Sequence, residues 1–232
     1  MMMQRYKNIQ IIFLIAILAL VAPTVSAVGD PGRLTVIKSR ARAEITRRLN
    51  SLNRLNSAIN GTSRLSDSAK STLSGEVNAE ISDLTRLKSK IAADTDLATA
   101  RIDAQAIFTE YRIYALVVPK VWLVRTVDDQ QAVEDKLNTM IGKLQTRINT
   151  AQGQGKDTAS LQAALNDMTA QVHAAQIIAL KTGAAILRVQ PTDYNNDHSV
   201  LGGYVDQVQQ AHRYNQAAYA NLKIIVQGLK TL

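Results

Sequence analysis

Residues 161–189 read LQAALNDMTAQVHAAQIIALKTGAAILRV, and their apolar side chains recur alternately four and three residues apart. The recurring positions are Leu161, Leu165, Met168, Val172, Ala175, Ala179, Thr182, Ile186 and Val189. A 4-3 spacing places all of them along one edge of an α-helix, and that edge must be buried against partner helices. At 1.5 Å per residue the helix is about 45 Å long. The stretch therefore predicts a long helix in a coiled-coil-like bundle.

Similar apolar stripes extend over most of the chain and predict two helical hairpins. Residues 31–93 carry two stripes, separated by a helix-ending Asn60-Gly61 and by Ser66, a residue type that caps helices. Residues 126–190 carry two more, separated by Gly153-Gln154-Gly155. Because each connection is short, the two helices of a hairpin should be antiparallel neighbours.

The remaining segments are a helix followed by a kinked stretch at 96–125, a polar loop at Pro191–His198, and a C-terminal helix at 198–231. The chain contains no cysteine and few aromatic residues, so narrow seams of Ala, Leu, Ile and Val must hold it together. We therefore expect residues 28–232 to form a single elongated all-α domain, an antiparallel bundle or set of coiled-coil hairpins with five or six helices.

The stretch IYALVVPKVWLV at residues 113–124 departs from the helical pattern. Proline inside a helix removes a hydrogen bond and clashes with the preceding turn, so Pro119 should end or kink the helix. The next helix then begins either at Pro119 or at Thr126, and the sequence does not separate these alternatives. This segment is either buried between helix pairs or forms a membrane-inserting or partner-binding patch, for which the candidate residues are Tyr111, Tyr114, Val118 and Trp122.

The first 27 residues have the pattern of an export signal. Arg5 and Lys7 precede an apolar run from Ile11 to Ala22, and Val25-Ser26-Ala27 is a small-residue cleavage pattern. We expect a secreted, periplasmic or cell-surface protein, which is membrane-anchored if this segment is not cleaved. Removing residues 1–27 takes away two basic residues and no acid, so the net charge of +8 becomes +6.

Arginines recur every seven residues in the first predicted helix, at Arg33, Arg40, Arg47 and Arg54. They form one ridge, which we call the arginine ridge. One interpretation is a contact surface for an acidic polymer, an anionic lipid surface or another partner. The other is a charged flank that pairs with Glu76, Glu80 and Asp83 of the next helix. No aromatic residues interleave with these arginines, so nucleic acid is an unexpected partner.

The C-terminal helix continues the 4-3 spacing through two polar residues. Its predicted seam is Leu201, Val205, Val208, His212, Asn215, Tyr219, Leu222, Val226 and Leu229. A polar residue in an apolar seam reduces stability but fixes the register and the number of partners. We therefore expect His212 and Asn215 to set the register, and a homo-oligomer is compatible with such a seam.

The sequence contains no signature of an enzyme. Gly153-Gln154-Gly155-Lys156 has the glycines of a phosphate loop only in part, and Asp157 stands where that loop needs serine or threonine. We expect no catalytic residue, no cofactor and no metal.

Residues 108–124, FTEYRIYALVVPKVWLV, follow DTDLATARIDAQ at 94–105 and precede a hairpin that ends in IVQGLK at 225–230. This combination resembles a group of uncharacterised exported α-helical proteins of reduced-genome bacteria, a resemblance that implies a helical fold and export but no activity. We expect a structural or interaction scaffold of the cell envelope or cell surface. The alternatives are a basic holdase-like chaperone or polyanion-binding protein, and a membrane-active protein that uses residues 113–124.

Overall fold

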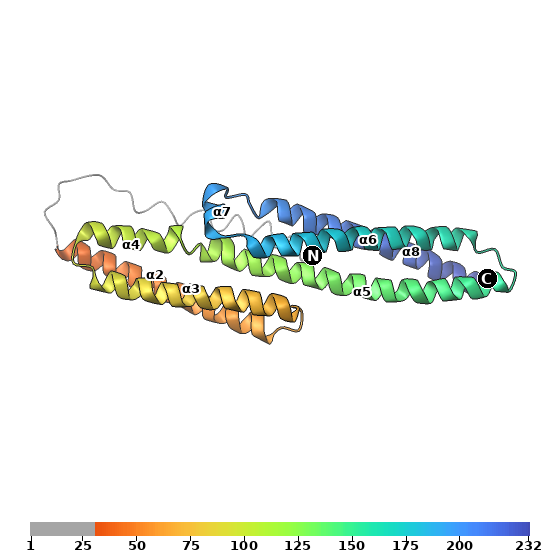
Figure 1. The fold of residues 1–232 in the computed structure, drawn as a ribbon, viewed down its shortest axis with the longest axis horizontal. Coiled ribbons are helices and arrows are strands. Elements are labelled where there is room, and N and C mark those ends of the chain that lie inside the picture. The colour runs from red at the N-terminus through yellow and green to blue at the C-terminus, as the bar shows by residue number, and fades with distance from the viewer. Residues whose placement is uncertain (1–30) are drawn as a thin grey trace.

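The computed structural model describes residues 31–232, and the predicted export signal at 1–27 lies outside the described residues. Between residues 31 and 232 every regular element is a helix, which confirms the all-α prediction. Figure 1 shows that the long helices run nearly along one axis and give an elongated molecule. The elements are α2 (Pro31–Gly61), α3 (Asp67–Ala93), α4 (Leu97–Thr109), the π-helix η1 (Ile113–Val117), α5 (Val118–Gly153), α6 (Ala159–Arg188), α7 (Pro191–Asn196) and α8 (Gly202–Thr231).

Six of these helices form two three-helix bundles. The first bundle consists of α2, α3 and α4, and the second bundle consists of α5, α6 and α8. The two bundles overlap along the first half of α5, where the turn between α2 and α3 lies beside that helix (Figure 1). The backbone N–H of Ser66 donates to Asp128 Oδ2 at 2.7 Å across this contact.

Two apolar clusters make up the core. The larger cluster fills the first bundle and continues through η1 into the adjoining parts of α5, α6 and α8. The smaller cluster fills the far part of the second bundle and includes Leu137, Leu165, Val172 and Leu222. The first bundle and the near end of the second bundle thus share one core.

Local sequence signals explain where the helices begin. Ser66 caps α3, because its Oγ accepts a hydrogen bond from the N–H of Ala69 at 3.3 Å. Asp96 caps α4 in the same way, through the N–H of Thr99 at 2.9 Å. The α2 helix begins at Pro31, a residue type that is well suited to the first helical position because it needs no N–H donor there.

The chain is helical through the segment that the sequence marked as broken. The α5 helix begins at Val118 with Pro119 in its first turn, so the start at Pro119 is correct and the start at Thr126 is wrong. Thr126 lies inside α5, where its Oγ1 donates to the carbonyl of Trp122 at 2.9 Å.

The polar loop expected at Pro191–His198 is also partly helical, since Pro191–Asn196 forms α7. The carboxylate of Asp193 accepts the N–H of Gln190 at 2.8 Å and so supports the first turn. Asn195 ties α7 to the end of α4, because its Nδ2 donates to the carbonyl of Thr109 at 2.8 Å. Asp193 therefore caps the short helix α7, and Asn195 attaches α7 to α4, instead of both lying in an irregular loop.

Candidate functional site

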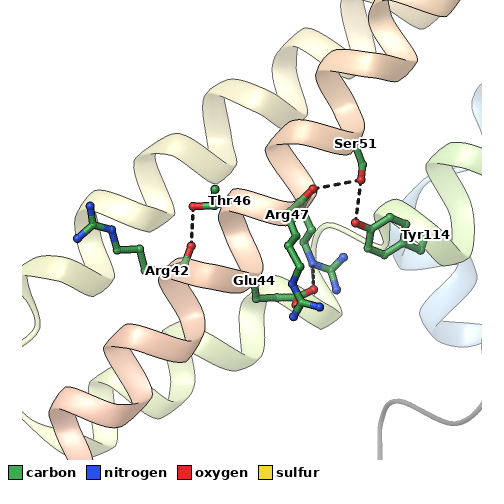
Figure 2. A network of polar contacts seen from close by, with 7 residues as sticks. Arg42, Glu44, Thr46, Arg47, Ser51 and Tyr114 are labelled. Carbon is green, nitrogen blue, oxygen red and sulfur yellow. Dashed lines mark hydrogen bonds and ion pairs between the residues drawn. The ribbon is translucent and has the colours of Figure 1, made fainter.

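The arginine ridge lies on an exposed face of α2. All four of its side chains, those of Arg33, Arg40, Arg47 and Arg54, are exposed. Arg47 forms an ion pair with Glu44 of the same helix, and Figure 2 shows these two side chains directed toward each other. Within residues 31–232 no ion pair joins Arg40 or Arg54. The ridge is therefore an accessible row of positive charge.

The acidic residues of α3 do not pair with the ridge, so the expected cross-helix pairing is wrong. Glu76 instead pairs with Lys120 of α5, and Asp83 pairs with Arg86 within α3. Glu80 is partly buried, and its Oε2 has no hydrogen-bond donor. The α2 helix contains seven basic residues and one acid, and α3 leaves most of this charge unneutralised.

Beside the ridge, Arg48 is buried and holds three elements together. Its guanidinium carbon lies 4.9 Å from the ring centre of Phe108 in α4 and 5.2 Å from that of Tyr114 in η1. Its Nε donates to Glu44 Oε1 at 2.9 Å. The Tyr114 hydroxyl lies 2.9 Å from Ser51 Oγ, and Figure 2 shows this contact next to the Arg47–Glu44 pair. Cation–π stacking and hydrogen bonds thus anchor η1 against α2.

The candidate patch at 111–124 faces mainly into the molecule. Tyr111, Tyr114 and Val118 are half-buried against the larger core cluster, whereas Trp122 is 44% exposed and stacks on Arg125. Six other apolar residues of this segment are buried: Ile113, Leu116, Val117, Val121, Leu123 and Val124. The expected burial of the segment is correct for these residues, but Trp122 does not fill the core. Across the part of the chain that the structure describes, no helix has the length and hydropathy of a membrane span.

Lys120 is a buried charge whose role the sequence did not indicate. Its side chain is 3% exposed, and its Nζ lies 2.8 and 2.9 Å from the two carboxylate oxygens of Glu76. The same Nζ donates to the carbonyls of Leu187 at 2.7 Å and Val189 at 3.1 Å, at the end of α6. One ammonium group therefore joins α3, α5 and α6. In the sequence, the one sign that Lys120 is buried was its position inside an apolar run.

Glu80 lies near this ion pair and has a perturbed acidity. Burial raises the pKa of Glu80 to about 7, and the negative charges of Asp83 and Glu76 add to the rise, while Lys120 opposes it. Desolvation disfavours the charged carboxylate, which explains the direction of the shift. The charged groups around Glu80 are thus Asp83 and Glu76 of the same helix and Lys120 of α5.

The two register residues of the C-terminal helix have different environments. Asn215 is buried, as expected, but His212 is exposed and the neighbouring Ala211 occupies the seam. Alternate members of the predicted seam are buried in α8, namely Val208, Asn215 and Leu222. The positions between them are wrong by one residue, since Ala211, Ala218 and Ile225 are buried in place of His212, Tyr219 and Val226.

Two buried polar residues of α5 that the sequence analysis missed, Glu134 and Gln130, bond to α8. Asn215 Nδ2 donates to Glu134 Oε1 at 3.2 Å, and Gln130, one turn earlier on α5, donates from Nε2 to the carbonyl of Val208 at 3.0 Å. The signal was present, since extending the 4-3 spacing backward from Leu137 reaches Glu134 and then Gln130.

Two shallow depressions mark the surface of the described residues. One depression of about 470 Å³ lies at the turn between α5 and α6 and is lined by Lys156, Asp157 and Gln162 among others. Another of about 340 Å³ lies beside α7. In residues 31–232 no group of three His, Cys, Asp or Glu side chains is placed to hold a metal ion.

No known protein family, no curated protein and no solved structure matches this chain.

Proposed function

We propose that this protein is a non-enzymatic, exported scaffold of the cell envelope or cell surface that acts by contacting partners along its length. The observation that carries the proposal is one apolar core cluster that runs from the first bundle into the near ends of α5, α6 and α8. A continuous apolar core favours one elongated body over two independently moving domains, because domains move relative to each other by default unless a hydrophobic interface joins them. An elongated body with shallow surface features is suited to bridging and holding other molecules.

The proposed location rests on the sequence of residues 1–27 and on the resemblance of residues 94–124 and 225–230 to exported helical proteins. The test is to fractionate cells that express the full chain and to measure the mass of the product. We expect recovery in an envelope or extracellular fraction, with the mature chain beginning near Val28 if the signal is cleaved. Recovery of the uncleaved chain only in the cytosolic fraction would contradict export.

A second candidate function is binding of an anionic partner through the arginine ridge. The specific support is that the four arginines span 21 residues of one helix face, about 31 Å, and that Glu76 and Asp83 of α3 pair with Lys120 and Arg86 instead. A row of accessible cations attracts phosphate or carboxylate groups through long-range Coulomb forces and release of counterions. An acidic polymer and an anionic lipid surface present this chemistry, and a holdase-like role would use the same face.

The arginine ridge can be tested with two defined anionic probes, polyphosphate and vesicles containing phosphatidylglycerol. Replacing Arg33, Arg40, Arg47 and Arg54 with glutamine should weaken binding about tenfold or more and flatten its salt dependence, because fewer counterions are released. The matched control replaces Lys136, Lys143, Arg147 and Lys223, four exposed cations of α5 and α8, with glutamine. Equal losses in both quadruple variants would show that only net charge matters and would overturn the ridge as a site.

A membrane-active role for residues 113–124 has less support, because six of its apolar side chains would have to leave the core. We therefore do not propose it.

A further inference from the structure

A polar layer interrupts the core of the second bundle. On α5 the buried apolar residues Val127 and Leu137 belong to the two different core clusters, and the buried residues between them are Gln130 and Glu134. On α8 the same change of cluster occurs between Val208 and Ala218, and Asn215 lies between them. The two apolar clusters therefore meet at a layer made of one carboxyl group and two amides.

This layer contains more acceptors than donors. Asn215 Nδ2 donates to Glu134 Oε1 at 3.2 Å, and Gln130 Nε2 donates to the carbonyl of Val208 at 3.0 Å. Three buried oxygens have no donor: Gln130 Oε1, Glu134 Oε2 and Asn215 Oδ1. Buried polar atoms are nearly always hydrogen-bonded, so three unpartnered acceptors in one layer require an explanation.

No positive charge balances Glu134 in its surroundings. Glu134 is 1% exposed, and within residues 31–232 its carboxylate forms no ion pair. On its own helix the nearest charge is Asp135, which is also negative. The antiparallel helices α5 and α6 meet where Val127 packs beside Gly183 and where Gln145 bonds to Gln162. Interpolating between these two points places Ala175 of α6 opposite Glu134. The ionisable residues nearest in sequence on the packed helices, His173 of α6 and His212 and Arg213 of α8, are exposed.

We propose that Glu134 is a proton-operated lock between α5 and α8: the neutral carboxyl group closes the polar layer, and the carboxylate loosens it. A proton on Oε2 removes an unbalanced buried charge and adds the donor that the layer lacks, which the oxygen of Asn215 can accept. Loss of that proton leaves a charged group among acceptors and apolar side chains, a state that burial disfavours strongly.

The acidity of the group agrees with this geometry. Burial raises the pKa of Glu134 from 4.5 to about 7, against the lowering effect of the Asn215 hydrogen bond. The folded pKa is higher than the unfolded one, so the folded chain keeps its proton over a pH range in which the unfolded chain has lost it. The stabilisation is full below about pH 4.5, declines as the pH rises from 4.5 to 7, and is absent above pH 7.

The test compares thermal unfolding of the full chain with that of Glu134→Gln between pH 5 and pH 8. Glutamine reproduces the neutral acid, with one acceptor for Asn215 Nδ2 and one donor for Asn215 Oδ1. We expect the variant to match the wild type within about 2 °C at pH 5 and to exceed its Tm by about 5–10 °C at pH 8. The matched control is Asp206→Asn, which removes an exposed carboxylate of α8 and should give equal differences at both pH values.

Glu80 titrates in the same pH window, so the difference between variant and wild type is the readout rather than the total decline. A Tm difference for Glu134→Gln that is the same at pH 5 and pH 8 would overturn the proposal. If the variant fails to fold, the carboxyl carbon of Glu134 can be titrated by NMR in the wild-type chain. A midpoint near 7 would support the lock, and a midpoint near 4.5 would overturn it.

Discussion

At the scale of single residues, the buried charged groups differ in how completely they are satisfied. Lys120 has four acceptor atoms within hydrogen-bond distance, from Glu76 and from two carbonyls at the end of α6. Glu134 has one donor and no opposite charge. Burial is therefore offset by four acceptors at Lys120, whereas at Glu134 it raises the pKa of the carboxyl group.

Lys120→Met should destabilise the protein by about 2–4 kcal/mol, because it leaves Glu76 and two buried carbonyls without their donor. The loss is smaller than for a fully buried ion pair, since the Glu76 side chain is 33% exposed. The measurement is the free energy of unfolding in urea. Lys136→Met, the same change at an exposed position of α5, should change the free energy of unfolding by no more than about 0.5 kcal/mol. An equally small change for Lys120→Met would mean that the contacts of Lys120 contribute little to stability.

Residue-scale outcomes show what one sequence can and cannot predict. Burial of Asn215 followed from its apolar spacing, and burial of Glu134 could have followed from the same rule. The partners of Glu76 and Lys120 could not, because they lie 44 residues apart and depend on how two bundles pack. Periodicity identifies which side of a helix is buried, whereas pairing across helices is decided by tertiary structure.

At the scale of elements, η1 explains how a proline fits within nearly continuous helix. Pro119 has no N–H to donate, and the N–H of Val118 just before it reaches the carbonyl of Ile113, five residues back. Arg112, which precedes η1, has a φ of 24°, so the backbone turns sharply before the π-helix begins. The sequence predicted a break here but not its form, because π-helices have no simple residue signature.

Half of the predicted seam of α8 was wrong for a different physical reason. The 4-3 spacing placed His212, Tyr219 and Val226 in the seam, but Tyr219 is 43% exposed. Ala211 and Ala218 are fully buried instead. Small side chains let neighbouring helices approach closely, so alanines of α8 can fill buried positions that larger apolar residues fill in other helices.

Glycines on two helices provide a test of this close packing. A Cβ added at Gly228 of α8 would overlap Leu161 Cδ2, whereas one at Gly142 of α5 would meet nothing within 4 Å. Gly142→Ala should stabilise the protein by about 0.5–1 kcal/mol through helix propensity. Gly228→Ala should destabilise it by about 1 kcal/mol, because displacing buried Leu161 outweighs that gain. Chemical denaturation of both variants measures the difference, and equal stabilisation would show that the α6–α8 seam is loose.

At the scale of the whole molecule, the fold class and the elongated arrangement followed from the sequence. Long stripes of Ala, Leu, Ile and Val, joined by short turns, allow little except lengthwise helix packing. The overlap of the two bundles was not predictable, because it depends on contacts such as Arg64 with Asp129 and Ser66 with Asp128.

Small-angle X-ray scattering should report the elongated shape directly. A compact domain of 232 residues has a radius of gyration of about 17 Å. We expect a clearly larger value and a skewed distance distribution with a long tail. A radius near 17 Å would mean that the bundles fold back on each other in solution.

The contribution of α5 to both apolar clusters has a mechanical consequence. The helix has 36 residues, about 54 Å, and Lys120 fastens it near one end. Its first half packs in the larger core cluster and its second half in the smaller one, so this one helix crosses the boundary between the two clusters. Tension applied between the two ends of the molecule would therefore be carried in part along the axis of α5.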